Sequence, residues 1–138
     1  MRKGPQPTSA SALNELSRQI LDAAFVVHDA LGPGLLESAY EACLEHVLTT
    51  AGVRVQRQVS LPVRFQEVFI DAGYRIDLRV GGTVIVEVKA VQKVAPIHKA
   101  QLLTYLKLSD LHLGLLLNFN VERMKFGIIR LVHRFPDP

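Results

Sequence analysis

The chain has 138 residues, of which 49% are hydrophobic and 21% are charged, and its formal net charge is +3. These values predict one folded domain with a modest core and exclude a disordered chain, while the single Cys43 excludes a disulfide framework within the chain. Because no apolar run reaches the length of a membrane span or a signal core, we expect a cytoplasmic protein without a membrane partner.

Two helices are expected early in the chain. They follow a short disordered arm over residues 1–11, and the domain itself is expected to cover residues 12–135. Apolar residues recur at helical spacing from Leu13 to Leu31, and Pro33, which stands between two glycines, ends that helix. A second helix is predicted from about Leu35 to Thr50.

Most of the remaining chain is predicted to be extended, because its apolar residues alternate or form short runs. The predicted strands cover residues 53–65 with an interruption at Pro62, 68–70, 113–119 and 126–132. Between them lie a hairpin over residues 77–89 and a third helix over residues 97–108, which Pro96 begins.

The hairpin, D-L-R-V-G-G-T-V-I-V-E-V-K, carries the strongest functional signal in the chain. A two-residue turn would split its apolar row and place Asp77 and Glu87 on opposite faces. A three-residue turn, Gly81 to Thr83, sets Asp77 opposite Glu87 with roughly 5 Å between their Cβ atoms. It also keeps the apolar row on one face, so we predict the three-residue turn. That row consists of Ile76, Leu78, Val80, Val84, Val86 and Val88.

Asp77 and Glu87 are the predicted metal ligands, because Mg²⁺ prefers hard oxygen atoms and is held by one or two carboxylates plus substrate phosphate. The backbone carbonyl of Val88 is a further predicted ligand. Lys89 is a candidate to orient or deprotonate the attacking water, or to stabilise the charge of the phosphorane. Since two close carboxylates repel each other, one of them is expected to have a raised pKa. The competing interpretation is an exposed cluster of ion pairs of little energetic value.

Two helices carry further polar candidates. Gln101 and Tyr105 lie four residues apart and share one helix face, with His98 nearby. Glu37 opens the second helix, and Tyr40 lies one turn further on. Taken singly, these residues have plainer explanations, such as an amphipathic helix facing water or an acid at a helix N-terminus. We nevertheless predict that Gln101, Tyr105 and Glu37 meet the hairpin acids and lysine in one cleft.

Five segments of the chain resemble a known family. The sequence G-L-L-E-S-A-Y at 34–40 resembles the G-x-x-E-x-x-Y signature of the GxxExxY proteins. The further segments are G-Y-R-I-D-L at 73–78, V-I-V-E-V-K-A at 84–90, H-K-A-Q-L-L-T-Y-L at 98–106 and L-L-N-F-N at 116–120. The resemblance covers nearly everything from about Leu13 to Val132, and that family is placed in the PD-(D/E)xK nuclease-like superfamily.

The resemblance implies a fold and a catalytic core. The fold would be α/β with α+β character, in which helices flank a central mixed β-sheet, as in restriction endonucleases. Asp77, Glu87 and Lys89 would form the D…ExK core. Glu37 would be the helix-borne acid that supplements the metal site.

The resemblance also implies a substrate-binding group. Gln101 and Tyr105 match the Q-x-x-x-Y element of RecB-like exonucleases and the lambda exonuclease, where it helps to hold the DNA end. His98 and Tyr40 are expected to join them as substrate-binding residues. The cysteines with which some RecB-like relatives hold an iron–sulfur cluster are absent here.

The residues and the resemblance together favour a metal-dependent nuclease that hydrolyses DNA phosphodiester bonds, exonuclease-like or on single strands, with Mg²⁺ or Mn²⁺ as cofactor. The alternatives are a non-catalytic module that binds nucleic acid or protein while retaining the fold, and an enzyme acting on RNA or a nucleotide. The intact acids and lysine favour the enzyme, because a binder gains nothing from clustered acids that face phosphate. A homodimer is compatible with the sequence, since a small domain of this type often needs a partner to encircle a duplex.

Overall fold

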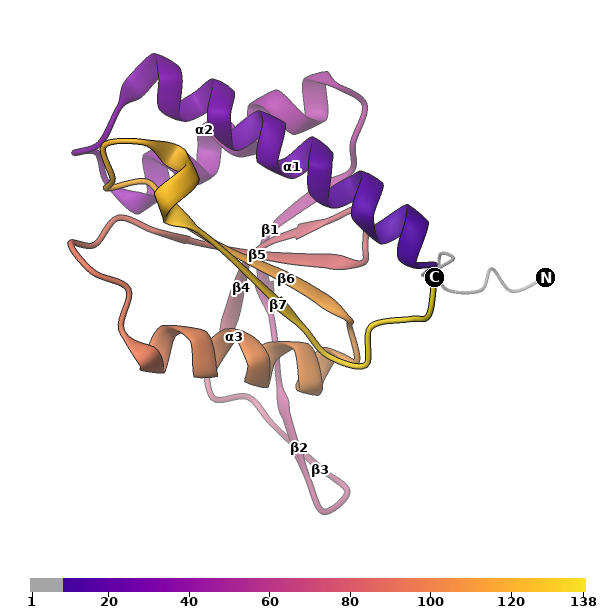
Figure 1. Ribbon diagram of the computed structural model, residues 1–138. Coiled ribbons are helices and arrows are strands. Elements are labelled where there is room, and N and C mark those ends of the chain that lie inside the picture. The colour runs from indigo at the N-terminus through magenta and orange to yellow at the C-terminus, as the bar shows by residue number, and fades with distance from the viewer. Residues whose placement is uncertain (1–8) are drawn as a thin grey trace.

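The computed structural model describes residues 9–138 and arranges their helices in layers on the two sides of a β-sheet (Figure 1). Its helices are α1 (Ala10–Leu31), α2 (Glu37–Thr50), α3 (Pro96–Ser109) and the short 3-10 helix η1 (Met124–Gly127). Its strands are β1 (Val55–Ser60), β2 (Val63–Phe65), β3 (Val68–Ile70), β4 (Arg75–Val80), β5 (Val84–Lys89), β6 (Leu113–Asn118) and β7 (Ile128–Val132).

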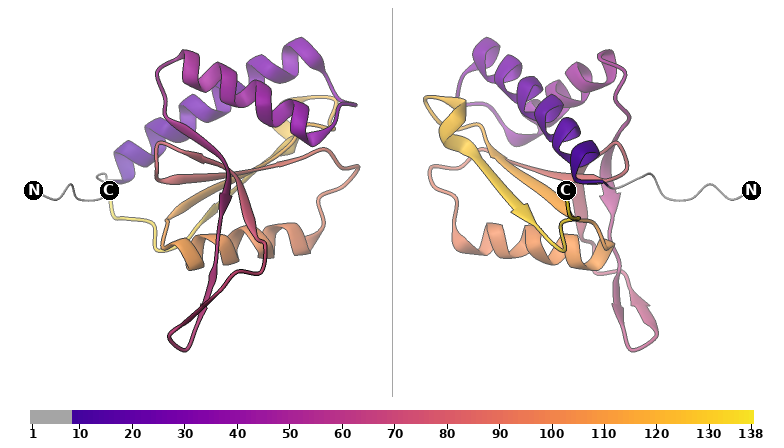
Figure 2. Two further views of the ribbon diagram at one scale, coloured as in Figure 1. Left: turned by 180° about the vertical axis from the view of Figure 1, so that it is seen from behind. Right: turned by 45° about the vertical axis from the view of Figure 1, so that its right-hand side comes forward.

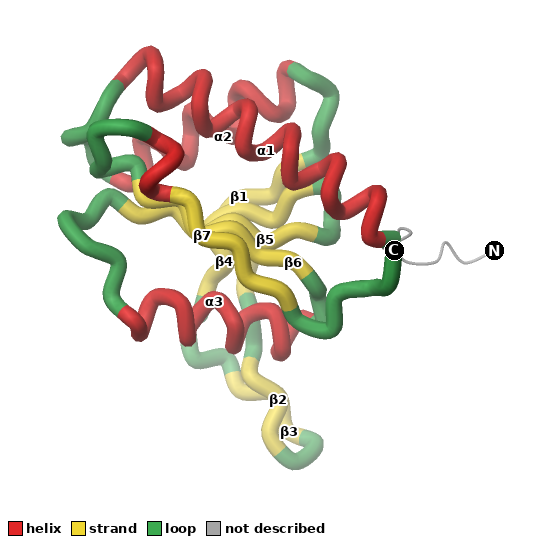
Figure 3. The backbone as a smooth tube through the Cα atoms, in the orientation of Figure 1, coloured by secondary structure: helices red, strands yellow, loops and turns green. Residues whose placement is uncertain are grey.

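The main sheet has five strands in the order β1-β4-β5-β6-β7. Strands β5 and β6 run parallel, and all other neighbours in this sheet run antiparallel. Helices α1 and α2 lie over one face and α3 lies over the other (Figures 1 and 3). The parallel pair requires a crossover connection, which α3 supplies between β5 and β6. This mixed sheet flanked by helices confirms the fold class expected from the sequence.

The core consists of two apolar clusters, one on each face of the sheet. Val84, Val86 and Val88 pack against α1 and α2, while Ile85 on the intervening position packs against α3. The predicted apolar row is wrong at one residue, because Ile76 belongs to the α3 cluster whereas the other five belong to the cluster under α1 and α2. Strand β4 therefore changes face next to Asp77.

The predicted hairpin register is confirmed. Val80 pairs with Val84 and Leu78 pairs with Val86, so the turn between β4 and β5 consists of residues 81–83. Gly81 and Gly82 have φ angles of 60° and 76°, in the left-handed region that glycine adopts without steric cost. The turn chemistry and the apolar pattern therefore specify the same register.

Several predicted boundaries differ from those in the structure. Helix α1 begins at Ala10, and Ser9 caps it by accepting a hydrogen bond from the N–H of Ala12 at 3.1 Å. The predicted disordered arm over residues 1–11 thus extends too far, and its first eight residues lie outside the described part. The last predicted strand began too early, because Phe126 belongs to η1.

Strands β2 and β3 form a separate two-stranded ribbon that projects past α3 (Figure 2). The extended stretch predicted over residues 53–65 is therefore divided at Pro62, with β1 in the main sheet and β2 in the ribbon. Phe65 and Phe69 on the ribbon are exposed. Within residues 9–138, no helix has the length and apolar character needed to cross a membrane.

Candidate active site

The main sheet divides at Asp77. The ladder between β4 and β5 ends at the pair Leu78–Val86, although both strands continue. Beyond that point β4 stays paired with β1, through Val59–Ile76, and β5 stays paired with β6, through Lys89–Asn118. The division leaves backbone N–H groups of both strands free to bond side chains instead of the facing strand.

Asp77 and Glu87 supply those side chains. The N–H of Asp77 donates to Glu87 Oε2 at 3.0 Å, and the N–H of Val88 donates to Asp77 Oδ2 at 2.8 Å. Each carboxylate is thus bonded to the backbone of the opposite strand, and the two acids lie between the strands rather than on opposite faces of the sheet. The predicted juxtaposition of Asp77 and Glu87 is confirmed.

Both acids have raised pKa values. Burial, and after it the charge of Asp77, raise the pKa of Glu87 to about 8 against the opposing effects of the bond from the Asp77 N–H and the charge of Lys89. Burial also raises the pKa of Asp77, against the bond from the Val88 N–H, with a smaller raising effect from Glu41. A raised pKa was expected from repulsion between the acids, but burial is the larger cause.

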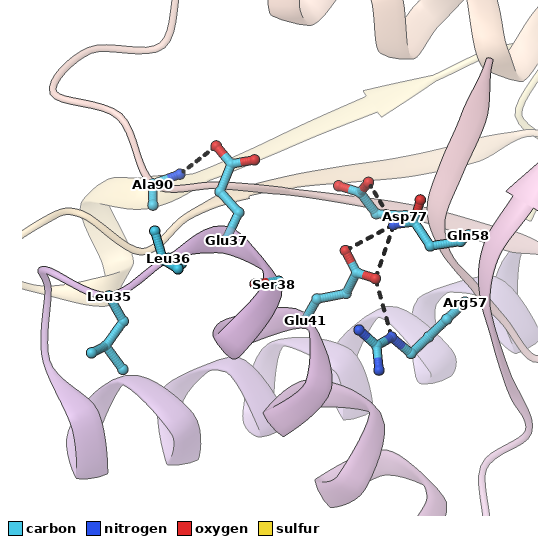
Figure 4. Close-up of a pocket in the computed structure, with 9 residues that line it drawn as sticks. All are labelled: Leu35, Leu36, Glu37, Ser38, Glu41, Arg57, Gln58, Asp77 and Ala90. Carbon is cyan, nitrogen blue, oxygen red and sulfur yellow. Dashed lines mark hydrogen bonds and ion pairs between the residues drawn. The ribbon is translucent and has the colours of Figure 1, made fainter. Parts of the chain in front are cut away.

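On the side of α2, Asp77 opens into a hollow of about 660 Å³, called here the α2 hollow (Figure 4). Its polar lining comes from Glu37, Ser38, Glu41, Arg57, Gln58 and Asp77. Glu37, the first residue of α2, accepts a hydrogen bond from the N–H of Ala90 at 3.1 Å, directly after the end of β5. The helix-borne acid therefore reaches the strand end that carries Glu87 and Lys89.

On the side of α3, Lys89 opens into a second hollow of about 620 Å³, called here the α3 hollow. His98, Gln101 and Tyr105 line it together with Lys89, as expected for residues on one helix face. His98 Nδ1 also accepts a hydrogen bond from the N–H of Ala95 at 3.1 Å, so this ring helps to cap α3. Burial raises the pKa of Tyr105, and the charges of Glu87 and Asp77 raise it further, which indicates a phenol close to the acids.

The residues predicted to share one cleft therefore divide between two hollows. Glu37 and Asp77 line the α2 hollow, whereas Lys89, Gln101 and Tyr105 line the α3 hollow. The hydrogen bond from the Val88 N–H connects Asp77 of the α2 hollow to β5, where Val88 directly precedes Lys89 of the α3 hollow. Asp77 therefore lines the α2 hollow, while its charge and that of Glu87 also act on Tyr105 in the α3 hollow.

The predicted contact of Tyr40 with substrate is wrong. Its side chain is fully buried, and its ring stacks on Phe119 with 4.5 Å between centroids. Its hydroxyl donates to the carbonyl of Gly32 at 2.5 Å and accepts from the N–H of Leu35 at 3.1 Å. Tyr40 therefore closes the loop between α1 and α2, and this loop determines where Glu37 begins the next helix.

Sequence reasoning missed three residues near the acids. Glu41 is buried and lies one helical turn after Glu37, so the four-residue spacing could have identified it. Asn118 on β6 restrains the chain beyond Lys89. Its side-chain amide accepts a hydrogen bond from the Val91 N–H at 3.0 Å and donates one to the Val91 carbonyl at 2.9 Å. Gln58 contacts Glu41 and Asp77 through its side-chain amide, and no pattern in the sequence indicates that role.

The carboxylate oxygens of Asp77 and Glu87 suit a divalent cation that prefers hard ligands. Asp77 Oδ1 and Glu87 Oε1 accept no backbone N–H from the described residues, and the Gln58 amide lies 3.5 Å from Asp77 Oδ1, so each acid keeps an oxygen with room for a ligand. In residues 9–138, no group of three or more His, Cys, Asp or Glu side chains could hold a metal ion by itself. Mg²⁺ commonly uses only one or two carboxylates, with water and substrate phosphate as its other ligands, so the pair is sufficient.

A protein-family model described as the PD-(D/E)XK nuclease superfamily matches residues 14–131 of the chain. The matched range includes α2, both strands of the hairpin and α3, and therefore every residue of the two hollows named above. No curated protein and no solved structure gives a match.

We predict that Tyr40→Phe lowers the free energy of unfolding by about 1–3 kcal/mol, because it leaves the Gly32 carbonyl and the Leu35 N–H without the hydroxyl. Urea denaturation measures the change. Tyr74→Phe is the matched control, since the Tyr74 side chain is exposed. Equal stability of wild type and Tyr40→Phe would contradict the role of Tyr40 in closing this loop.

We predict that Glu87→Gln stabilises the metal-free protein, and more so at pH 8 than at pH 5. Between the ordinary pKa of 4.5 and about 8, folded Glu87 keeps a proton that the unfolded chain releases, so wild-type stability falls as pH rises through this window. The advantage of the variant near pH 8 should be of the order of a few kcal/mol. Denaturation at both pH values, in the presence of a chelator, measures it.

Glu122→Gln is the control for this experiment, because Glu122 is exposed on the loop before η1. Its stability should follow that of the wild type at both pH values. An advantage of Glu87→Gln that is the same at pH 5 and pH 8 would contradict the raised pKa of Glu87.

Proposed function

The chain belongs to the PD-(D/E)XK nuclease superfamily, and we propose that it is a nuclease that uses Mg²⁺ or Mn²⁺ to hydrolyse DNA phosphodiester bonds, at ends or in single strands. Within that superfamily we propose that it is a GxxExxY protein, on the signature from Gly34 to Tyr40 and the segments around Asp77 and Glu87.

One observation supports this proposal most strongly. Two acids, Glu87 buried and Asp77 half-buried, lie together at the point where the sheet divides, and each is bonded to the backbone of the opposite strand. Burial of two carboxylates with raised pKa values is costly, and such groups are concentrated at functional sites. Lys89 lies beside them on the α3 side and Glu37 on the α2 side.

In the proposed mechanism, Asp77 and Glu87 would hold the divalent cation, with the Val88 carbonyl and Glu37 as further ligands. When bound, the cation supplies Lewis-acid polarisation of the phosphate and favours deprotonation of the attacking water. Lys89 would orient that water or, as the neutral amine, take its proton. In its ammonium form it would stabilise negative charge that develops on the phosphate oxygens. Glu87 must lose its proton before it can serve as a ligand, so metal affinity rises with pH.

The α3 hollow is the proposed substrate side of the site. Gln101 and Thr104 offer hydrogen-bonding groups, and Tyr74 and Tyr105 offer aromatic rings whose centroids are 6.2 Å apart. An exposed tyrosine supports stacking of an unpaired base, which favours a single strand or a frayed end. His98 borders the same hollow and is a further proposed contact.

We predict that the protein cleaves single-stranded DNA or DNA with free ends, and that cleavage requires Mg²⁺ or Mn²⁺. The cleavage rate should fall about 100-fold or more in Lys89→Ala, because this variant loses the lysine charge beside the phosphate. Gel assays on single-stranded, duplex and hairpin DNA, with and without a chelator, measure it. Lys93→Ala, which removes an exposed lysine four residues later, should cleave like the wild type.

The competing function is a non-catalytic module that binds nucleic acid or protein while it retains the nuclease fold. This alternative would be supported if DNA bound without any metal-dependent cleavage, and if Lys89→Ala changed neither activity nor metal affinity. Cleavage that persists in Asp77→Asn and in Glu87→Gln would place the catalytic site elsewhere.

We predict that Gln101→Ala raises the KM for DNA about tenfold, because the variant loses a hydrogen bond to substrate. The Kd for Mn²⁺ should stay unchanged, because Gln101 is not among the proposed metal ligands. Steady-state kinetics and calorimetric titration with Mn²⁺ measure the two quantities. Gln92→Ala, an exposed glutamine outside the α3 hollow, is the matched control. A weakened Kd for Mn²⁺ with an unchanged KM would contradict the assignment of Gln101 to substrate.

A further inference from the structure

Gln58 has an unusual backbone conformation for a residue inside a strand. Its φ angle is 52°, in the left-handed region, although β1 runs from Val55 to Ser60. Gln58 is not paired with β4, although its neighbours are, in the pairs Arg57–Leu78 and Val59–Ile76. A side chain with a Cβ atom is strained in this region, and such strain is most often retained at functional sites.

The distorted backbone brings the Gln58 side chain between two carboxylates (Figure 4). Its Nε2 donates to Glu41 Oε1 at 3.0 Å and Oε2 at 3.2 Å, and it lies 3.5 Å from Asp77 Oδ1. Glu41 is buried, and it also accepts from Arg57 Nε at 3.1 Å. A single amide therefore separates the acid of α2 from the acid of β4.

Asp77 is consequently held on both of its oxygen atoms. Oδ2 accepts a firm bond from the Val88 N–H at 2.8 Å, and Oδ1 faces the Gln58 amide at a longer distance. Without that amide, Glu41 and Asp77 would face each other as like charges across the α2 hollow. The Asp77 carboxylate would then be held only by the hydrogen bond from the Val88 N–H, and Asp77 Oδ1 would no longer have a fixed position.

We propose that Gln58 is a positioning residue of the metal site, which fixes Asp77 Oδ1 by placing its amide between Asp77 and Glu41. This inference rests on the proposed function. The strain at Gln58 is explained on this basis, because a regular strand conformation would direct the side chain away from the α2 hollow. An alternative is a local distortion that serves only the twist of β1, in which case the amide is dispensable.

Two variants separate the amide from the backbone strain. Gln58→Ala and Gln58→Gly both remove the amide, but only alanine keeps a Cβ atom at a positive φ. We expect both variants to lose about tenfold in Mn²⁺ affinity, the effect typical of residues that orient metal ligands. We expect the glycine variant to melt about 3 °C above the alanine variant, because it relieves the strain.

Gln66 provides the matched control. It is also a glutamine, its φ angle is 49°, and it lies in the turn between β2 and β3, outside both hollows. Gln66→Ala and Gln66→Gly should show the same difference in melting temperature as the Gln58 pair. Both should bind Mn²⁺ with wild-type affinity in calorimetric titration.

Wild-type Mn²⁺ affinity in both Gln58 variants would overturn the proposal, and so would an affinity that glycine restores and alanine does not. If the wild type itself binds no Mn²⁺, the proposed function fails, and crystal structures of the metal-free Gln58 variants decide the role of Gln58. A rotated Asp77 carboxylate in both variants would support positioning. An Asp77 carboxylate unmoved from its wild-type place would overturn it.

Discussion

Two hydrogen bonds between side chains and backbone cross from β4 to β5 where their ladder stops, and the candidate site depends on them. An antiparallel ladder would ordinarily satisfy the N–H groups of Asp77 and Val88 with carbonyls of the facing strand. Here the carboxylates of Glu87 and Asp77 take that place. The strands separate without leaving these buried donors unpaired, so the division of the sheet is compatible with a stable fold.

The same arrangement explains why the acids are electrostatically strained. Glu87 is buried and Asp77 is half-buried, and the bonds that they accept from backbone N–H groups offset only part of the cost of lost hydration, so their pKa values are raised. A divalent cation between them would reverse this effect, because it favours the charged form of both acids. In the metal-free form the site thus disfavours the charged form of both acids, and Glu87 keeps a proton that a bound cation would release.

The surrounding elements hold the acids in position from both sides of the sheet. Tyr40 closes the loop before α2 and so determines where Glu37 meets the end of β5. Asn118 binds both backbone groups of Val91 and so restrains the chain just beyond Lys89. These residues lie outside the proposed chemistry, yet an error of about 1 Å in the placement of Glu37 or Lys89 would be costly to catalysis.

Periodicity along the chain was sufficient to predict most of the helices and strands, the register of the hairpin and the pairing of Asp77 with Glu87. Those features are local, because alternation of apolar residues and two glycines in a turn decide them within a few residues. The four-residue spacing of Gln101 and Tyr105 likewise placed both on one face of α3. The role of Glu37 as a further acid of the metal site was predicted from the resemblance to the family.

Only the tertiary structure decided how those residues divide between two hollows, and which of them are buried in the core. Ile76 changes face because β4 twists where the sheet divides, and Tyr40 is buried because Phe119, from a distant strand end, stacks on its ring. The strained conformation of Gln58 depends on Glu41 and Asp77, which come from two other elements. Such contacts join residues far apart in sequence, so local patterns carry no record of them.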